Sequence, residues 1–424
     1  MQICQPVFPA SGIRCTEVID EKLHGCLLSL HFAVPRDART APMHALLTDL
    51  LTAASADYPE IGALSARLDA LYAADLSASL ILCGDSTDLH FTASWLDDAL
   101  TPDRKPITGA VLGLVLGCLL RPHAQNGSFD EALFAVCRQN LLDEIDAVLG
   151  NKREYALQLA AETAFAGEPA AIAPQGDRDL AMEVTPQECY ALWQEILQTA
   201  PIEIIAVLPR ENPQIMQMLR EGFANIARKP RLVTWLSPSP CRAEPVLAED
   251  DIAVSQSKLV LVYKYSDIPR RTAELLTKML SGTGTSLLFV NVREREGLCY
   301  DCSATHSALK CAVVIECGVQ PGREQAAADA ICAQIEALQT GDFPDSLCEE
   351  AKLSTEYAAA LSLDSASGIE GRIAAAYRCG ETPALTVADP AVRRLTRADL
   401  TEAACRLRLD TVLMLHGTET EADP

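Results

Sequence analysis

The stretch SGTGTSLLFVNVREREGLCY at residues 281–300 decides the fold. Its small residues are typical of a turn that ends one helix, and the run SLLFVNVRERE favours a second helix. Gly297 can take the left-handed conformation that commonly closes a helix. The residues LCYDCSA, which begin at Leu298, are typical of the start of a strand. The stretch therefore predicts a helix, a turn, a second helix and a strand in close succession.

A similar order of elements occurs earlier in the chain and indicates an internal repeat. Strand-like residues at 27–34, a polar turn and the helical MHALLTDLLTAAS at 43–55 match KLVLVYKY at 258–265, a polar turn and TAELLTKMLSGTG at 272–284. The two helices align at an offset of 229 residues. Any two amphipathic helices could share this spacing of leucines, but the ordered series in both halves favours duplication.

Short strands mixed with pairs of helices favour an α+β fold. We expect two homologous halves, each an antiparallel sheet with helices packed on one face. The proline- and serine-rich WLSPSPCRAEP is typical of a linker. It predicts an N-terminal domain at 1–235, a linker at 236–248 and a C-terminal domain at 249–424. The expected strands lie near 27–34, 76–83, 86–95, 202–208, 258–264, 298–306, 310–319 and 411–417.

Composition excludes several classes of protein. The 424 residues contain 35 Lys and Arg against 58 Asp and Glu, a formal net charge of −23, which disfavours binding to nucleic acid or to an anionic membrane. The longest apolar run, VLGLVLGCLL, is about half the ~20 residues that a membrane-spanning helix needs. No secretory signal is visible, so we expect a cytoplasmic protein whose 16 cysteines are mostly reduced.

The succession of a small-residue turn, SLLF, an Arg–Glu run and Gly-Leu-x-Tyr resembles the C-terminal domain of the insulinase, pitrilysin and mitochondrial processing peptidase superfamily. The resemblance continues through KCAVVIECGV at 310–319 and VRRLTRADLTEAACRL at 392–407, and LLTDLLTAASADYP at 46–59 resembles the N-terminal domain. It implies two homologous α+β halves that close like a clamshell on a peptide. Within the superfamily the chain is most similar to bacterial zinc-less members associated with 5-aminopentanol modification of elongation factor P, through LYAADL, NGSFDEALF and VLVYK.

Active members of the superfamily carry the motif HxxEH on the first helix. Two histidines at i and i+4 share one helical face and bind zinc, and the glutamate activates water. The resemblance places Ala45, Thr48 and Asp49 at these positions, and none of them can take the required role. His44 is one residue out of register and is interpreted as an ordinary helix-face histidine. Glu144 is a possible remnant of the third zinc ligand, or else a solvated carboxylate.

Other metal or redox sites have weaker support in the sequence. The remaining histidines show no spacing typical of metal ligands, which leaves open only a site assembled through tertiary contacts; they are His24, His31, His90, His123, His306 and His416. The CYDC at 299–302 is a CxxC motif that is followed by Cys311 and Cys317. We interpret these cysteines chiefly as strand positions.

The resemblance assigns substrate contacts to Arg293 and Tyr300. An arginine and a tyrosine seven residues apart reach toward the substrate in the superfamily, and this pair has that spacing and setting. Guanidinium and phenol groups both donate hydrogen bonds, which suits a peptide carbonyl and the oxyanion it becomes. The alternative is a salt-bridged arginine beside a half-buried tyrosine.

Together these features predict a pseudopeptidase that is not active alone. The resemblance implies a peptide-binding subunit with no cofactor of its own, whose zinc-bearing HxxEH paralogue supplies the metal in a heterodimer. One alternative is a structural scaffold that has lost peptide handling. Another is an autonomous peptidase with an unusual metal site. We further expect part of the acidity to line the peptide chamber and favour basic peptides.

Overall fold

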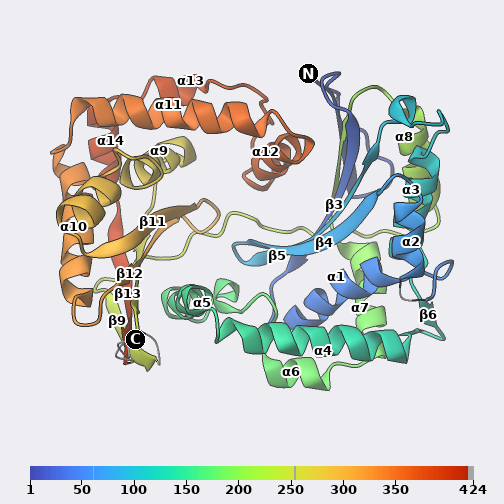
Figure 1. Cartoon of the computed structure of the whole chain (residues 1–424), viewed down its shortest axis with the longest axis horizontal. Coiled ribbons are helices and arrows are strands. Elements are labelled where there is room, and N and C mark those ends of the chain that lie inside the picture. The colour runs from blue at the N-terminus through green and yellow to red at the C-terminus, as the bar shows by residue number, and fades with distance from the viewer. Residues whose placement is uncertain (61, 253–254, 419–424) are drawn as a thin grey trace. The chain divides into compact units, whose positions relative to one another are not determined.

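The computed structural model describes residues 1–60, 62–252 and 255–418 (Figure 1). The chain forms two compact units, and neither is continuous in sequence. Unit 1 comprises Met1–Ala147, Ile172–Trp235 and Ser362–Leu385. Unit 2 comprises Val148–Ala171, Leu236–Leu361 and the chain from Thr386 onward. Each unit is a sheet flanked by helices, which confirms the predicted α+β fold.

Unit 1 is built on a six-stranded sheet. Its strands are β1 (Gln2–Ile3), β2 (Ile13–Ile19), β3 (Gly25–Pro35), β4 (Asp75–Cys83), β5 (Ser86–Leu96) and β8 (Ile202–Leu208). Their spatial order is β1-β2-β8-β3-β5-β4. The β2–β8 pair is parallel and the other pairs are antiparallel. Nearly every residue of β3 is buried, because both faces of the sheet are covered.

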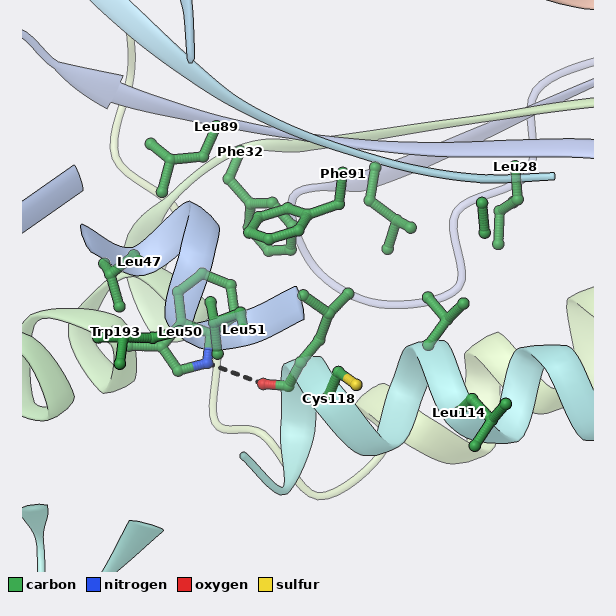
Figure 2. Packing of buried hydrophobic residues seen from close by; sticks show 14 of the residues in the cluster. Leu28, Phe32, Leu47, Leu50, Leu51, Leu89, Phe91, Leu114, Cys118 and Trp193 are labelled. Carbon is green, nitrogen blue, oxygen red and sulfur yellow. Dashed lines mark hydrogen bonds between the residues drawn. The ribbon is translucent and has the colours of Figure 1, made fainter. Parts of the chain in front are cut away.

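Helices from the first half of the chain cover one face of this sheet. They are α1 (Ala41–Ala53), α2 (Ala63–Asp69), α3 (Thr108–Leu120), α4 (Glu131–Val148), α6 (Arg178–Glu183), α7 (Pro186–Thr199) and α8 (Pro213–Phe223). A small hairpin of β6 (Ala124–Gln125) and β7 (Ser128–Phe129) joins α3 to α4. Trp193 is fully buried in the core between them, against Phe32 and Phe91 (Figure 2). Its indole nitrogen donates a hydrogen bond to the Leu119 carbonyl at 2.8 Å. Among the described helices, α3 included, each is too short or too polar to cross a bilayer.

Unit 2 repeats this plan. Its sheet contains β9 (Val246–Ile252), β10 (Ser257–Lys264), β11 (Cys299–Ser307), β12 (Ala312–Val319) and β13 (Arg408–Gly417). The order β9-β13-β10-β12-β11 matches β2-β8-β3-β5-β4 of unit 1 strand for strand. The pair β9–β13 is parallel, like its counterpart β2–β8 in unit 1, and the other pairs are antiparallel. This agreement supports the duplication that the sequence indicates.

The helices on one face of this second sheet include the segment that decides the fold. They are α9 (Arg270–Leu280), η3 (Leu288–Arg295), α10 (Glu324–Thr340), α11 (Asp345–Ser362), α13 (Pro390–Arg393) and α14 (Arg397–Ala404). The helix expected after the small-residue turn is present, but it is the wider π-helix η3. Gly297 has a φ of 58°, the left-handed conformation predicted for it.

Each unit receives one helix from the other half of the chain. The helix α12 (Ala366–Arg378) packs Ile369 and Ile373 on the second face of the unit 1 sheet. The helix α5 (Lys152–Ala164) lays Ala156 and Ala160 on the second face of the unit 2 sheet. The two helices hold equivalent places, one following α4 and the other α11. The sequence predicts helices on one face of each sheet, and the structure adds these two helices on the second face.

Five strands, β1, β2, β6, β7 and β9, are absent from the sequence prediction. Part of the expected linker also contacts unit 2: the Ser237 amide donates to the Leu309 carbonyl at 2.8 Å, and Arg242 pairs with Asp410 at 3.1 Å. The division into domains at 1–235 and 249–424 stays a prediction about which parts fold independently.

Candidate functional site

The three degenerate zinc-motif positions lie on α1 in unit 1. Ala45 has no ligand atom, and the Thr48 hydroxyl donates to the Ala45 carbonyl at 2.7 Å, so it serves its own helix. Asp49 is partly buried one residue further on. The helix therefore presents one carboxylate where two imidazoles and a glutamate would be needed for catalytic zinc.

Asp49 and Glu144 face the same cavity, of about 650 Å³. Its lining comes from α1 and α4 and includes a third carboxylate, Asp143. Burial and the negative charge of Glu144 raise the pKa of Asp49 to about 6. The structure thus brings the predicted remnant Glu144 to the degenerate motif, in an acidic cavity that contains no histidine among its lining residues.

His44 belongs to a different cavity, of about 290 Å³, whose lining includes Val34, Asp37 and Leu192. This place agrees with its register, because neighbouring residues on a helix point about 100° apart. Burial lowers the pKa of His44 to about 4, although the charge of Asp37 opposes the shift. His44 is therefore neutral at pH 7 and lies apart from the Asp49–Glu144 cavity.

The burial of His44 predicts a loss of stability in acid. The unfolded chain takes up a proton below about pH 6.5, whereas folded His44 stays neutral until about pH 4, so stability falls as the pH drops through this window. Between pH 7 and pH 5 the wild-type free energy of unfolding should fall by about 2 kcal/mol more than that of His44→Leu. Urea titrations at the two pH values measure this, with His24→Leu as the exposed control; equal losses in all three proteins would contradict it.

Arg293 and Tyr300 lie in unit 2, on η3 and β11 respectively. The Arg293 guanidinium lies over the Phe289 ring at 4.9 Å and 3.4 Å from the Glu294 carboxylate. Tyr300 is 74% exposed rather than half-buried. It lines a small pocket of about 100 Å³ whose other residues include Arg153 and Glu316. Both predicted substrate contacts are accessible from solvent.

Three thiols gather beside this pair. Cys302 and Cys317 are directly opposed on β11 and β12, and Cys299 hydrogen-bonds with both. These hydrogen bonds and the charge of Arg293 lower the pKa of Cys299, while the same contacts raise the pKa of Cys302. Cys311 lies outside the group, with its thiol 3.8 Å from the Ala308 carbonyl. The CxxC cysteines are strand residues, as interpreted, but they also form a compact thiol group.

A buried ionic cluster in unit 1, on the face covered by α12, has no counterpart in the sequence prediction. His31 and His90 are paired across β3 and β5, and their rings stack with centroids 4.3 Å apart. The Glu370 carboxylate accepts from His31 Nε2 at 2.7 Å, and Asp88 accepts from His31 Nδ1 at 2.9 Å. Arg378 donates to the same carboxylate of Asp88.

The charges within this cluster balance. Burial alone would lower the pKa of His31, but Asp88 and Glu370 outweigh it and raise the pKa to about 9. Burial and the charge of His31 lower the pKa of His90 to about 4. With His31 and Arg378 positive and both carboxylates negative, the cluster is neutral at pH 7. Sequence reasoning missed it because strand register and helix exchange bring these residues together.

Comparisons with known proteins relate the chain to M16 peptidases. A family model described as "Peptidase M16 inactive domain" matches residues 184–354. The "Probable inactive metalloprotease YmfF" of Bacillus subtilis is 22% identical over 414 residues, 96% of each chain. The chain is an insulinase-like M16 peptidase homologue that lacks the zinc motif. This confirms the family resemblance and assigns the M16 homologue to the inactive type. The placement of Ala45, Thr48 and Asp49 at the motif positions stays a prediction.

Solved structures share the fold of this M16 homologue. A conserved protein from Enterococcus faecalis V583 has a TM-score of 0.88 at 21% identity, over 99% of both chains. The peptidase M16 inactive domain from Pseudomonas fluorescens has a TM-score of 0.79 at 16% identity, over 100% of both chains. Both matches cover the residues of unit 1 and of unit 2.

Proposed function

We propose that this M16 homologue is a non-catalytic subunit that binds peptides and complements a partner subunit with an intact HxxEH motif. The proposal depends on one contrast. Helix α1 has lost its zinc ligands, whereas Arg293 and Tyr300 keep their spacing and are accessible to solvent. A partner that supplies zinc and the water-activating glutamate gives these two donors a role, since they suit a peptide carbonyl.

The strand that carries Tyr300 supports peptide binding. β11 lies at one edge of the unit 2 sheet, where a row of backbone groups can pair with an extended peptide. Tyr300 and the neighbouring Asp301 both line the adjoining pocket. A peptide added along β11 gains main-chain hydrogen bonds from the strand and a contact from the Tyr300 hydroxyl.

The acidic cavity of unit 1 supports a preference for basic peptides. Asp49, Asp143 and Glu144 line it together, and burial and the negative charge of Glu144 raise the pKa of Asp49. A lysine or arginine side chain would offset the negative charge of the cavity. We therefore expect basic peptides to bind more tightly than acidic ones, and increasingly so at low ionic strength.

The decisive experiment uses the two-chain enzyme. We expect this chain, co-expressed with an HxxEH paralogue, to form a complex that cleaves basic fluorogenic peptides of about ten residues, a typical upper strand length. Neither chain should cleave them alone. Replacing Arg293 by Ala should lower kcat/KM by about 10²–10³ while the complex stays intact, because a donor to the developing oxyanion is lost.

The matched control is Arg295→Ala, which removes an exposed charge two residues away on the same helix. This control should keep near-normal activity. Absence of a complex, or equal activity of Arg293→Ala and Arg295→Ala, would overturn the proposal. A stable complex whose activity is unchanged by substitution of Arg293 or of Tyr300 would instead indicate a scaffold role for the chain.

A further inference from the structure

We propose that His31, His90 and Glu370 form a binding site for a divalent transition metal of the zinc type. Their ligand atoms all lie within 4.8 Å of one another. The Glu370 carboxylate oxygen is 2.7 Å from His31 Nε2 and 3.8 Å from His90 Nε2. Two imidazole nitrogens and one carboxylate are a ligand set used for zinc and for ferrous iron.

The present contacts show how a metal would enter. Zinc bound to nitrogen and oxygen at about 2.0–2.2 Å holds its ligand atoms roughly 3.3 Å apart, between the two distances from Glu370. The hydrogen bond from His31 Nε2 to Glu370 places a proton where the metal would lie. Metal binding must therefore displace this proton, as it does whenever a protonated ligand is recruited.

An outer shell is already built around His31. Its Nδ1 is held by Asp88 at 2.9 Å, the carboxylate–histidine arrangement that orients metal ligands. Arg378 donates to the same oxygen of Asp88, Oδ2, that His31 Nδ1 contacts. Asp88 is fully buried, and its second oxygen is one of only three buried side-chain atoms without a hydrogen-bond partner in the described part of the chain. An unpartnered buried carboxylate oxygen beside these ligands favours a positive ligand in the cluster.

The His90 ring has to rotate before all three ligands can bind one metal ion. The His31 and His90 rings are stacked with only 6° between their planes, so their lone pairs do not converge on one point. His90 Nε2 now contacts the Thr92 hydroxyl at 3.0 Å. The His90 side chain is 16% exposed, at the edge of the cluster, which gives its ring room to rotate. The same opening leaves a fourth coordination position accessible to water.

The proposed metal site is separate from the degenerate zinc motif. Side chains alternate along β3, so Leu30 and Phe32 face the core shared with α1, whereas Ser29 and His31 face α12. A metal here would join α12, which comes from the second half of the sequence, to β3 and β5. Its role would be to fasten the exchanged helix to the sheet.

The test measures zinc binding to the full-length protein with a competing chromophoric chelator. His90→Phe keeps the ring stack but removes the ligand nitrogen, and Glu370→Gln keeps the shape but removes the charge. We expect each to bind one equivalent fewer at high affinity, a loss of at least about 100-fold at this site. His24→Gln, which changes an exposed histidine, is the matched control and should bind like wild type.

Cobalt distinguishes this site from the 16 cysteines. Thiolate ligation gives strong near-ultraviolet absorption, whereas a site of nitrogen and oxygen ligands gives only visible bands. We expect the variants to lose visible bands alone, and wild type to release about one proton on binding. Unchanged stoichiometry and affinity in His90→Phe would overturn the proposal. Should Glu370→Gln fail to fold, as judged by circular dichroism, His90→Phe decides alone.

Discussion

Replacing Arg378 by Met should destabilise unit 1 by about 3–5 kcal/mol. The substitution leaves Asp88 and Glu370 in a buried site with a single positive partner, His31. Asp88 is fully buried, so water cannot compensate for the lost guanidinium. All three tryptophans of the chain lie in unit 1, so their fluorescence during urea unfolding in chelator-containing buffer measures the effect.

Two further variants separate charge from packing in this experiment. Arg372→Met removes another charge from the same helix, one that donates to the Ala384 carbonyl, and should change the free energy of unfolding by less than about 1 kcal/mol. Combining Arg378→Met with Asp88→Leu should recover part of the loss, because an apolar pair of similar volume often replaces a buried ion pair without cost. An equal loss from Arg372→Met and Arg378→Met would contradict the ionic explanation.

Replacing Trp193 by Ala should cost about 4 kcal/mol of stability. The indole is fully buried with its ring centroid 5.2 Å from that of Phe32 and 6.0 Å from that of Phe91, so its loss opens a cavity between α7 and the sheet. The Leu119 carbonyl also loses its 2.8 Å hydrogen bond. Circular dichroism during urea unfolding is the appropriate measurement, since the substitution removes a fluorophore.

The control is Trp193→Phe, which keeps an aromatic ring but no donor. It should cost about 1–3 kcal/mol, mainly from the unsatisfied carbonyl. Comparable losses in Trp193→Ala and Trp193→Phe would show that the hydrogen bond, and not the filled volume, dominates at this position.

Much of the fold was accessible from local patterns. The 281–300 stretch predicted two helices, a left-handed helix end at Gly297 and the strand β11, because each depends on nearby residues. Strand β9 was missed because its sequence, VLAEDDI, is acidic and largely exposed. The exchange of α5 and α12 could not be predicted, since an apolar helix face shows that the helix is buried but not against which sheet.

The candidate site likewise contains residues that sequence spacing could find and residues that it could not. The family motif directed attention to Asp49 and Glu144, which line the same cavity between α1 and α4, and their role stays a prediction. His31 and His90 carry no spacing signal, because they meet only through the register of β3 and β5. Glu370 reaches them through the exchanged helix, although it lies 339 residues from His31 in the sequence. Such a cluster depends on tertiary structure alone.

The exchanged helix α12 also delays the completion of unit 1 during synthesis of the chain. The last strand of the unit 1 sheet, β8, ends at Leu208, but α12 ends only at Arg378. At about 5–20 residues per second, a ribosome needs of order ten seconds or more to make the residues between them. Throughout that interval Val18, Leu27 and Val207 have no cover on their face of the sheet. One apolar face of the unit 1 sheet is therefore exposed to solvent until the second half of the chain is synthesised. A chaperone would be needed during this interval.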